Sequence, residues 1–105
     1  MTDATSRVVQ DRLRLEVQGR WRERGFSCEL WVDPPETIWE DFVHDADELV
    51  LLLDGDVTIE IAGRTLRLEV GQEVLLPAGV RHTVRNVGGN SARWLYGYRL
   101  EGLTA

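Results

Sequence analysis

Residues 71–86 read GQEVLLPAGVRHTVRN, and this stretch decides the fold of the chain. It reads as two short strands joined by a tight turn, because Pro77 fixes one backbone angle and Gly79 can adopt the positive φ that other residues avoid. The turn delivers His82 to a set position on the second strand. Since side chains alternate between the two faces of a strand, His82 and Val84 share an apolar face. The opposite face is predicted to be charged and solvated and carries Arg81, Thr83 and Arg85.

The spacing in residues 71–86 resembles the second motif of the cupins, small double-sheet jelly-roll barrels, and every fixed position of that motif is filled. The first motif of the family is His-x-His, three or four residues, Glu, six residues and Gly. It corresponds here to residues 42–55, where His44, Glu48 and Gly55 match and Phe42 stands in place of the first histidine. The resemblance covers a barrel from about residue 26 to residue 100. It implies an all-β double-stranded β-helix.

The cupin resemblance also implies a metal site, because His44, Glu48 and His82 fall on its metal-ligand positions. Two histidines and one carboxylate suit one divalent ion, Fe, Mn, Ni or Zn, and leave coordination positions open. Phe42 cannot coordinate, so the site has three family ligands instead of four. On a regular strand Glu40 lies one inward step earlier, where it either supplies a replacement oxygen or stays at the solvated rim. The alternative to a metal site is a metal-free His/Glu hydrogen-bonded core.

A small-molecule ligand is expected in the barrel. The candidate ligand-binding residues are Phe42, Val84, Trp94 and Tyr96. Trp39 and Tyr98 can also stack on a planar ligand. The alternative is that these aromatic side chains belong to the core or to a subunit interface.

The N-terminal segment, residues 1–25, is expected to precede a barrel of residues 26–105. Its apolar residues recur every four positions, which favours a helix that Thr5 or Ser6 caps and that has Gly19 near its end. These residues are Val9, Leu13, Val17 and Trp21. Alternation around residues 13–17 also fits a strand. Either element would supply an apolar face that covers one side of the barrel.

Short strands with glycine or proline turns are expected from residue 26 onward, as in a sandwich or barrel. In residues 49–53, Val50 and Leu52 share one face with Glu48, which leaves three leucines on the other face. A second subunit or the N-terminal segment must cover that second surface. The aromatic residues of 94–98 also share one face, which either forms a contact between subunits or lines the barrel. Both surfaces favour a homodimer.

The chain has 105 residues, which fits one domain. It lacks an apolar run of about 20 residues, so no membrane partner is expected. Its formal net charge of −6 argues against nucleic acid as a partner. Cys28 is the single cysteine and is expected to be a small buried hydrophobe, in agreement with a soluble cytoplasmic protein.

Three classes of function fit these observations. The first is a metal-dependent oxygenase, isomerase or lyase, in which the ion polarises a substrate or activates water or O₂. The second is a non-catalytic module that binds or senses a small ligand without a catalytic metal, which the presence of Phe42 favours. The third is a structural or storage domain whose His/Glu cluster only supports the fold. Because jelly rolls host unrelated functions, the fold alone does not choose among them.

Overall fold

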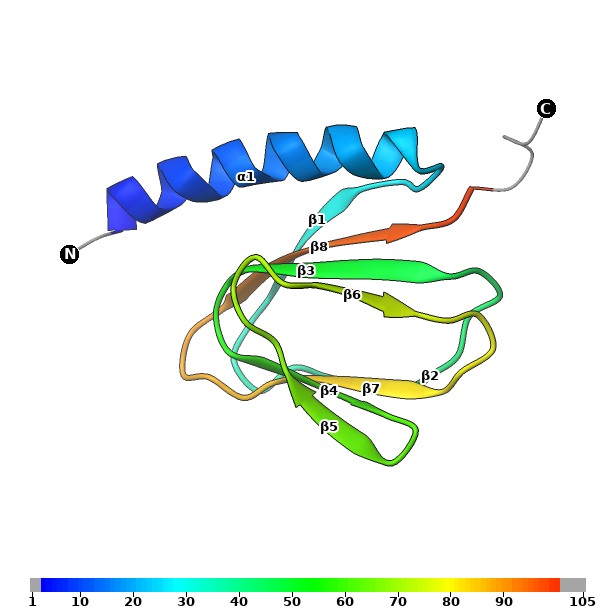
Figure 1. Cartoon of the computed structure of the whole chain (residues 1–105). Helices are drawn as coiled ribbons and strands as arrows, with labels where there is room; N and C mark the ends of the chain where they lie inside the picture. Colours follow the sequence, from blue (N-terminus) through cyan, green and yellow to red (C-terminus); the bar gives the residue numbers. More distant parts are fainter. Residues whose placement is uncertain (1–2, 101–105) are drawn as a thin grey trace.

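The computed structural model describes residues 3–100 of the chain, with side chains for residues 7–40 and 42–100. Over this range a single helix, α1 (Asp3–Glu23), precedes two four-stranded antiparallel sheets that face each other (Figure 1). The strands are β1 (Glu29–Asp33), β2 (Ile38–Phe42), β3 (Glu48–Asp54), β4 (Val57–Ile61), β5 (Arg64–Arg67), β6 (Glu73–Leu76), β7 (His82–Asn86) and β8 (Ala92–Tyr98). The first sheet has the order β1-β8-β3-β6 and the second β2-β7-β4-β5. The predicted all-β jelly roll is therefore confirmed.

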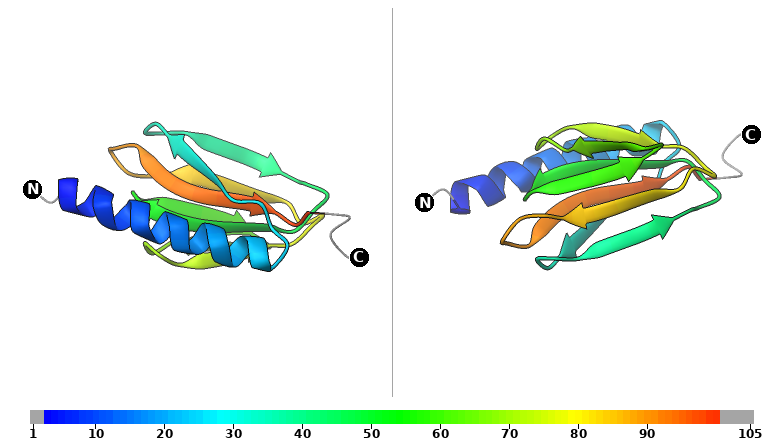
Figure 2. Two further views of the ribbon diagram at one scale, coloured as in Figure 1. Left: turned by 90° about the horizontal axis from the view of Figure 1, so that it is seen from above. Right: turned by 90° about the horizontal axis from the view of Figure 1, so that it is seen from below.

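Strand β3 is buried on both of its faces, and the two faces meet different partners. Val50 and Leu52 point into the space between the sheets and pack against residues of both. The other face packs against α1 through Val17 and Trp21, both fully buried. That face consists of Leu49, Leu51 and Leu53. Figure 2 shows α1 lying across the outer side of the first sheet.

The N-terminal helix, and not a second subunit, thus covers the leucine face of β3. This is the second of the two alternatives left open by the sequence, so this face no longer argues for a homodimer. The aromatic face of β8 also lies inside the barrel, where Trp94, Tyr96 and Tyr98 line a pocket between the sheets. The homodimer remains a prediction without these two surfaces as its support.

The helix differs from its expected form in two details. It already includes Thr5 and Ser6, so neither residue caps its start, whereas Gly19 lies near its end at Glu23, as expected. Val9 is 59% exposed, whereas Gln10 is buried and its Oε1 accepts a hydrogen bond from Arg93 at 2.9 Å. The reason is geometric: a spacing of four residues drifts by about 40° per step on a helix of 3.6 residues per turn. Three steps away from Trp21, Val9 has rotated off the buried face.

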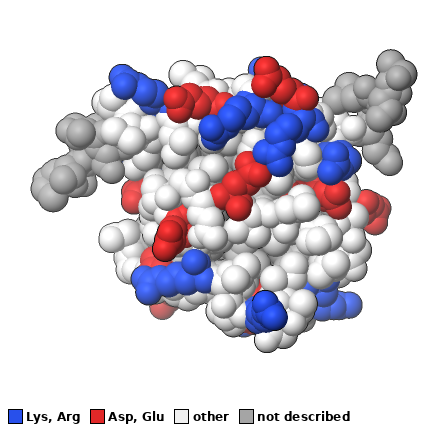
Figure 3. Space-filling model, in the orientation of Figure 1, with Lys and Arg blue, Asp and Glu red and all other residues white. Residues whose placement is uncertain are grey.

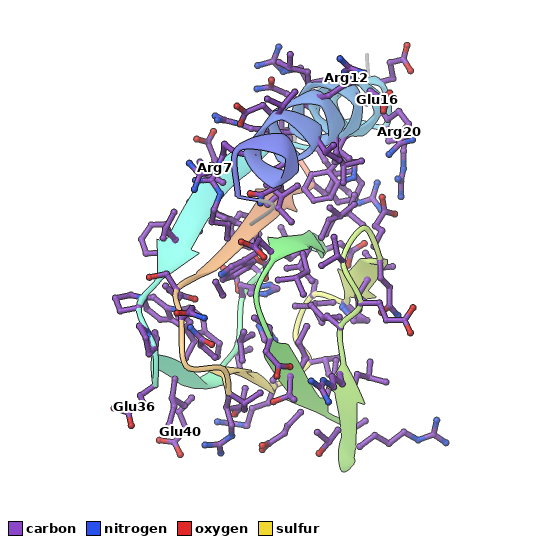
Figure 4. The ribbon with its side chains drawn as sticks, turned by 90° about the vertical axis from the view of Figure 1, so that its left-hand side faces the viewer. Arg7, Arg12, Glu16, Arg20, Glu36 and Glu40 are labelled. Carbon is purple, nitrogen blue, oxygen red and sulfur yellow. The ribbon has the colours of Figure 1, made fainter. Side chains whose placement is uncertain are left out.

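The outer surface of α1 carries charges of both signs. Figure 4 shows Arg12 and Glu16 pointing away from the sheets. In Figure 3 basic and acidic side chains alternate along this side of the molecule instead of forming a patch of one sign. Within residues 3–100, the structure has no helix with the length and apolar character needed to cross a bilayer.

Candidate functional site

His44, Glu48 and His82 meet between the two sheets. His44 lies in the loop after β2, Glu48 opens β3 and His82 opens β7. Each offers one ligand atom, and these atoms lie within 4.8 Å of one another. Nε2 of His44 is 2.8 Å from Oε1 of Glu48, and Nε2 of His82 is 3.8 Å from the same oxygen. The structure therefore brings together the three residues that the cupin resemblance selects.

Backbone carbonyls orient both imidazole rings. Nδ1 of His44 lies 2.8 Å from the carbonyl oxygen of Ala46, and Nδ1 of His82 lies 3.3 Å from that of Val80. A carbonyl only accepts hydrogen bonds, so the ring proton belongs on Nδ1, and Nε2 of each neutral ring keeps a lone pair. Both lone pairs are directed toward Glu48. Metal-bound histidines are held in this same way, with the second ring nitrogen donating to a backbone or carboxylate oxygen.

This arrangement leaves a polar atom without a hydrogen bond. Nε2 of His44 is buried and, among the described residues, no group donates a hydrogen bond to it. Its short contact to the Glu48 carboxylate is then a contact between two lone pairs, which repel each other unless a cation or a proton lies between them. The donor set therefore fits a divalent ion with two nitrogen ligands and one oxygen ligand.

The electrostatics of the cluster follow from its burial. Glu48 is 5% exposed and His82 is 4% exposed. Burial raises the pKa of Glu48, an effect that the nearby His44 opposes. Burial also lowers the pKa of His82; the Val80 carbonyl opposes this shift and His44 adds to it. Both shifts favour the uncharged forms, and a bound cation would reverse this preference for the carboxylate.

Two hydrogen bonds connect the loop that carries His44 to the turn that precedes His82. The N–H of Gly79, whose φ is +78°, donates to the carbonyl of His44 at 2.9 Å. The N–H of Ala78 donates to Oδ1 of Asp47, also at 2.9 Å. That hydrogen bond, with the Arg99 side chain, lowers the pKa of Asp47. Asp47 thus links the two motif segments.

Glu40 does not join the cluster, and a β-bulge is the reason. In the pairing of β2 with β7, Trp39 lies opposite Val84 and Phe42 lies opposite His82, so β2 has one residue more than β7 in this interval. Trp39 and Phe42 therefore share the inner face. Glu40 is exposed and points away from the barrel at the foot of Figure 4. The expectation that Glu40 shares a face with Phe42 is wrong.

A cavity of about 180 Å³ opens beside the cluster. Glu48 and His82 line it together with apolar residues, and all four candidate ligand-binding residues contribute to its wall: Phe42, Val84, Trp94 and Tyr96. Trp31, Trp39 and Tyr98 complete its aromatic lining. Most of the wall is thus carbon surface, with polar groups at the His/Glu end.

The aromatic side chains around this cavity form a closed circuit. Successive ring centroids lie 4.9 to 6.3 Å apart, mostly in edge-to-face geometry. The circuit runs through Trp31, Trp39, Phe42, His82, His44, Tyr98 and Tyr96 and back to Trp31. Each ring is therefore braced by two others, at spacings at which aromatic pairs attract.

Asp33 is a component of the site that sequence reasoning missed. It is 3% exposed, and its carboxylate accepts hydrogen bonds from the indole N–H groups of Trp31, Trp39 and Trp94. The sequence shows it only as the residue before Pro34, where aspartate is typical of a strand end. The one available signal was its place two residues after Trp31, on the same face of β1.

Comparisons with known proteins agree with this architecture. The model of the family described as "Cupin domain" matches residues 29–98. Polyketide synthase CurC from Streptomyces cyaneus is 32% identical over 72 residues, which cover 69% of this chain and 47% of that protein. The tetracenomycin polyketide synthase protein TcmJ from Streptomyces glaucescens is 26% identical over 72 residues, which cover 69% and 48%. The chain thus spans about half the length of these curated relatives.

A solved structure shows the same fold. It is that of a Cupin 2 conserved barrel domain protein from Salinispora arenicola, with a TM-score of 0.65 and 20% sequence identity. The match covers 75% of this chain and 66% of the other. At this level of identity the likeness concerns the fold alone.

Proposed function

Because the chain belongs to the cupin domain family, we propose that it holds one divalent ion, Fe, Mn, Ni or Zn, at His44, Glu48 and His82, and binds a small aromatic ligand beside it. One observation carries this proposal: both histidines use Nδ1 on backbone carbonyls, at Ala46 and Val80, and direct Nε2 toward the Glu48 carboxylate. An ion bound there would polarise a ligand oxygen or activate water or O₂. The activity that we propose is that of a metal-dependent oxygenase, isomerase or lyase.

The residues of the chain have separate tasks in this proposal. Glu48 supplies the negative charge and the two imidazoles supply neutral nitrogen donors. The hydrogen bonds of Gly79 and Ala78 hold the two ligand-bearing segments in register. The aromatic wall excludes water from the ligand and strengthens the electrostatic interactions at the His/Glu end.

The chemistry of the ligand follows from the pocket and from the relatives. The wall offers flat aromatic surfaces, and the polar groups gather at one end, so the ligand is planar and carries oxygen at one edge. Both curated relatives are named as polyketide synthase proteins, and a polyketide is rich in carbonyl oxygens. A conjugated carbonyl or phenolic compound satisfies both requirements.

The size of the cavity limits how much of such a ligand enters. A cavity of about 150 Å³ holds benzene, and this one measures about 180 Å³. One ring therefore fits inside. A larger ligand would extend past Trp31 and Phe42, whose side chains are 38% and 43% exposed at the mouth.

Phe42 supports a second candidate function, a binding or sensing module without catalytic metal. Its ring lies 6.3 Å from that of His82 with an interplanar angle of 27°, in the place where the family resemblance would put a fourth ligand. In this alternative Glu48 and the histidines bind the ligand directly.

Elemental analysis tests the metal proposal. Protein purified without a histidine tag or chelator should contain close to one transition-metal ion per chain. His82→Ala should lose this metal and keep the fold, as judged by circular dichroism. Arg81→Ala is the matched control, because the neighbouring Arg81 is exposed and should leave occupancy unchanged. Absence of metal even after reconstitution would contradict the proposal and leave the binding module.

We further propose that the protein acts in the cytoplasm as a homodimer and does not bind nucleic acid. The free, buried thiol of Cys28 supports the cytoplasm as the compartment. The net charge of −6 supports the absence of nucleic acid binding. Val32 and Ile38, each nearly half exposed on strands β1 and β2 at the sheet edges, are the apolar surface that supports the dimer. A monomer mass in light scattering would overturn the proposed homodimer.

A further inference from the structure

The pocket is built between two buried carboxylates that have different surroundings. Glu48 at one end lines the cavity and faces two imidazoles. Asp33 does not line the cavity, but the three indole rings whose N–H groups donate to its carboxylate do. Asp33 therefore acts on a ligand only through Trp31, Trp39 and Trp94.

The three indoles come from three different strands and converge on this one side chain. Trp31 is on β1, Trp39 on β2 and Trp94 on β8, so the carboxylate joins an edge strand of each sheet to an inner strand. Nε1 of Trp94 donates to Oδ2 at 2.9 Å, and Nε1 of Trp39 is shared between both oxygens at 3.2 and 3.3 Å. A single acceptor thus fixes the orientation of three rings.

Hydrogen bonds from Asn86 fix the backbone at Asp33. The side-chain amide of Asn86 donates to the carbonyl of Asp33 at 3.2 Å and to that of Pro34 at 3.0 Å. Among the described side chains, no Arg or His forms an ion pair with Asp33, so the indole N–H groups are what compensates its burial. Hydrogen bonds to a charged acceptor are about twice as strong as neutral ones, so rotating one indole away carries a large cost.

This geometry decides what the wall presents to a ligand. Indole has one polar group, its N–H, and in Trp31, Trp39 and Trp94 that group is taken up by Asp33. Only the carbon surface of the three rings remains for the cavity. A ligand that reaches this end finds no hydrogen-bond donor in the three indoles and gains only from stacking and edge contacts.

We propose that Asp33 is the positioning residue that makes this pocket selective for a flat aromatic ring, because it locks three indoles with their N–H groups turned away from the ligand. The inference rests on the proposed ligand pocket and not on the metal. Without this acceptor the three indoles rotate independently, so the width of the pocket between them is no longer fixed. Their N–H groups then become available as hydrogen-bond donors to non-planar polar ligands.

Tryptophan indole ¹H–¹⁵N resonances test the locking. Asp33→Asn keeps the size of the side chain but replaces one acceptor with an NH₂ donor. It should shift the indole signals of Trp31, Trp39 and Trp94. The signal of Trp21, whose Nε1 donates to Glu73 at 2.8 Å, should stay unchanged. Glu73→Gln is the matched control and should shift Trp21 alone. A shift of only one of the three signals in Asp33→Asn would overturn the shared lock.

Probe binding tests the selectivity. Phenol and cyclohexanol differ in planarity and share one hydroxyl, and both are measured by titration on chelator-treated protein and on Zn²⁺-loaded protein. Wild type should bind phenol at least tenfold more tightly than cyclohexanol, and Asp33→Asn should reduce this ratio roughly tenfold. Equal affinities for phenol and cyclohexanol in wild type would overturn the inference. An affinity ratio in Asp33→Asn that equals that of wild type would do the same.

The two measurements separate the inference from the proposed metal function. If wild type binds no Zn²⁺ but keeps the phenol preference on chelator-treated protein, the metal proposal fails and the role of Asp33 stands. If Asp33→Asn does not fold, Trp31→Phe takes its place, because Trp31 is 38% exposed and its replacement removes only one donor. That variant should shift the Trp39 and Trp94 signals and lower the phenol preference; no shift would contradict the lock.

Discussion

Nε2 of His44 lies 2.8 Å from Oε1 of Glu48, while the other nitrogen of the same ring lies 2.8 Å from the carbonyl of Ala46. The second contact assigns the ring proton, and the first then brings two lone pairs together. The pair is therefore better suited to enclosing a cation than to stabilising the empty fold. A binding site and a structural buttress therefore predict different effects when the Glu48 carboxylate is replaced, which gives a direct test.

Glu48→Gln should remove metal binding and at the same time preserve or increase the stability of the metal-free protein. The amide NH₂ can donate to Nε2 of His44, and no buried carboxylate remains in the His/Glu cluster. We expect a gain of up to about 1 kcal/mol in the free energy of unfolding, measured with urea on chelator-treated protein. A clear loss of stability would show that the His/Glu cluster supports the fold.

Phe42→His should raise metal affinity by roughly tenfold or more, equivalent to about 1.4 kcal/mol. Phe42 pairs with His82 across β2 and β7 and stacks on its ring, so a histidine there places a fourth donor beside the cluster. Isothermal titration with Zn²⁺ measures the change, with Phe42→Leu as the control that alters size but adds no donor. Equal affinities in the two variants would contradict this position for residue 42.

Gly97→Ala and Gly19→Ala should change stability in opposite directions. A Cβ at Gly97 would collide with the carbonyl oxygen of Ser27 and lie 3.1 Å from the ring of Trp21, so β8 or the helix must move. Such overpacking costs about 1–3 kcal/mol or more. At Gly19, in an exposed helix position where a Cβ would meet no atom within 4 Å apart from the chain neighbours and the helix backbone, alanine should add about 0.5–1 kcal/mol. Thermal unfolding of both variants is the measurement.

The two glycines are each other's control, because the chemical change is the same in both. If Gly97→Ala unfolded at the temperature of wild type, the close approach of β8 to the chain at Ser27 would be wrong. If Gly19→Ala were destabilising, the position of residue 19 inside the helix would be wrong.

Cys28 should react slowly with iodoacetamide in the folded protein. Burial raises the pKa of its thiol, an effect that Arg14 partly offsets, and only the thiolate is nucleophilic. The rise of the alkylation rate with pH should therefore occur at higher pH in the folded chain than in urea. The stability that this thiol contributes is fully present below its unfolded pKa of about 8.5 and is lost as the pH rises above it.

Cys28→Ala provides the control for this pH dependence. Its stability should decline less than that of wild type between about pH 8 and pH 10, the range in which the unfolded thiol ionises. Equal alkylation rates in the folded and urea-unfolded states would contradict the buried position of Cys28.

The sequence by itself determined most of the strands and, on the regular strand β3, the faces of its residues. Pro77 and Gly79 define the turn locally, and the period-two pattern places Glu48 beside Val50 and Leu52 inside the barrel. Together with the spacing of His44 and His82, these local features carry the resemblance to the cupins, and that resemblance implied the jelly roll and the residues of the candidate metal site. Alternation along a strand depends on that strand alone, so no partner needed to be known.

Only the tertiary structure decided what lies opposite each face. The bulge of β2 replaces Glu40 by Trp39 on the inner face, and it exists only in the pairing with β7. The role of Asp33 depends on three indoles from strands far apart in the sequence. The three leucines on one face of β3 indicate that this face is buried, but the pattern does not identify α1 as the element that covers it. Register and coverage are properties of two segments in contact, which the pattern of a single segment does not contain.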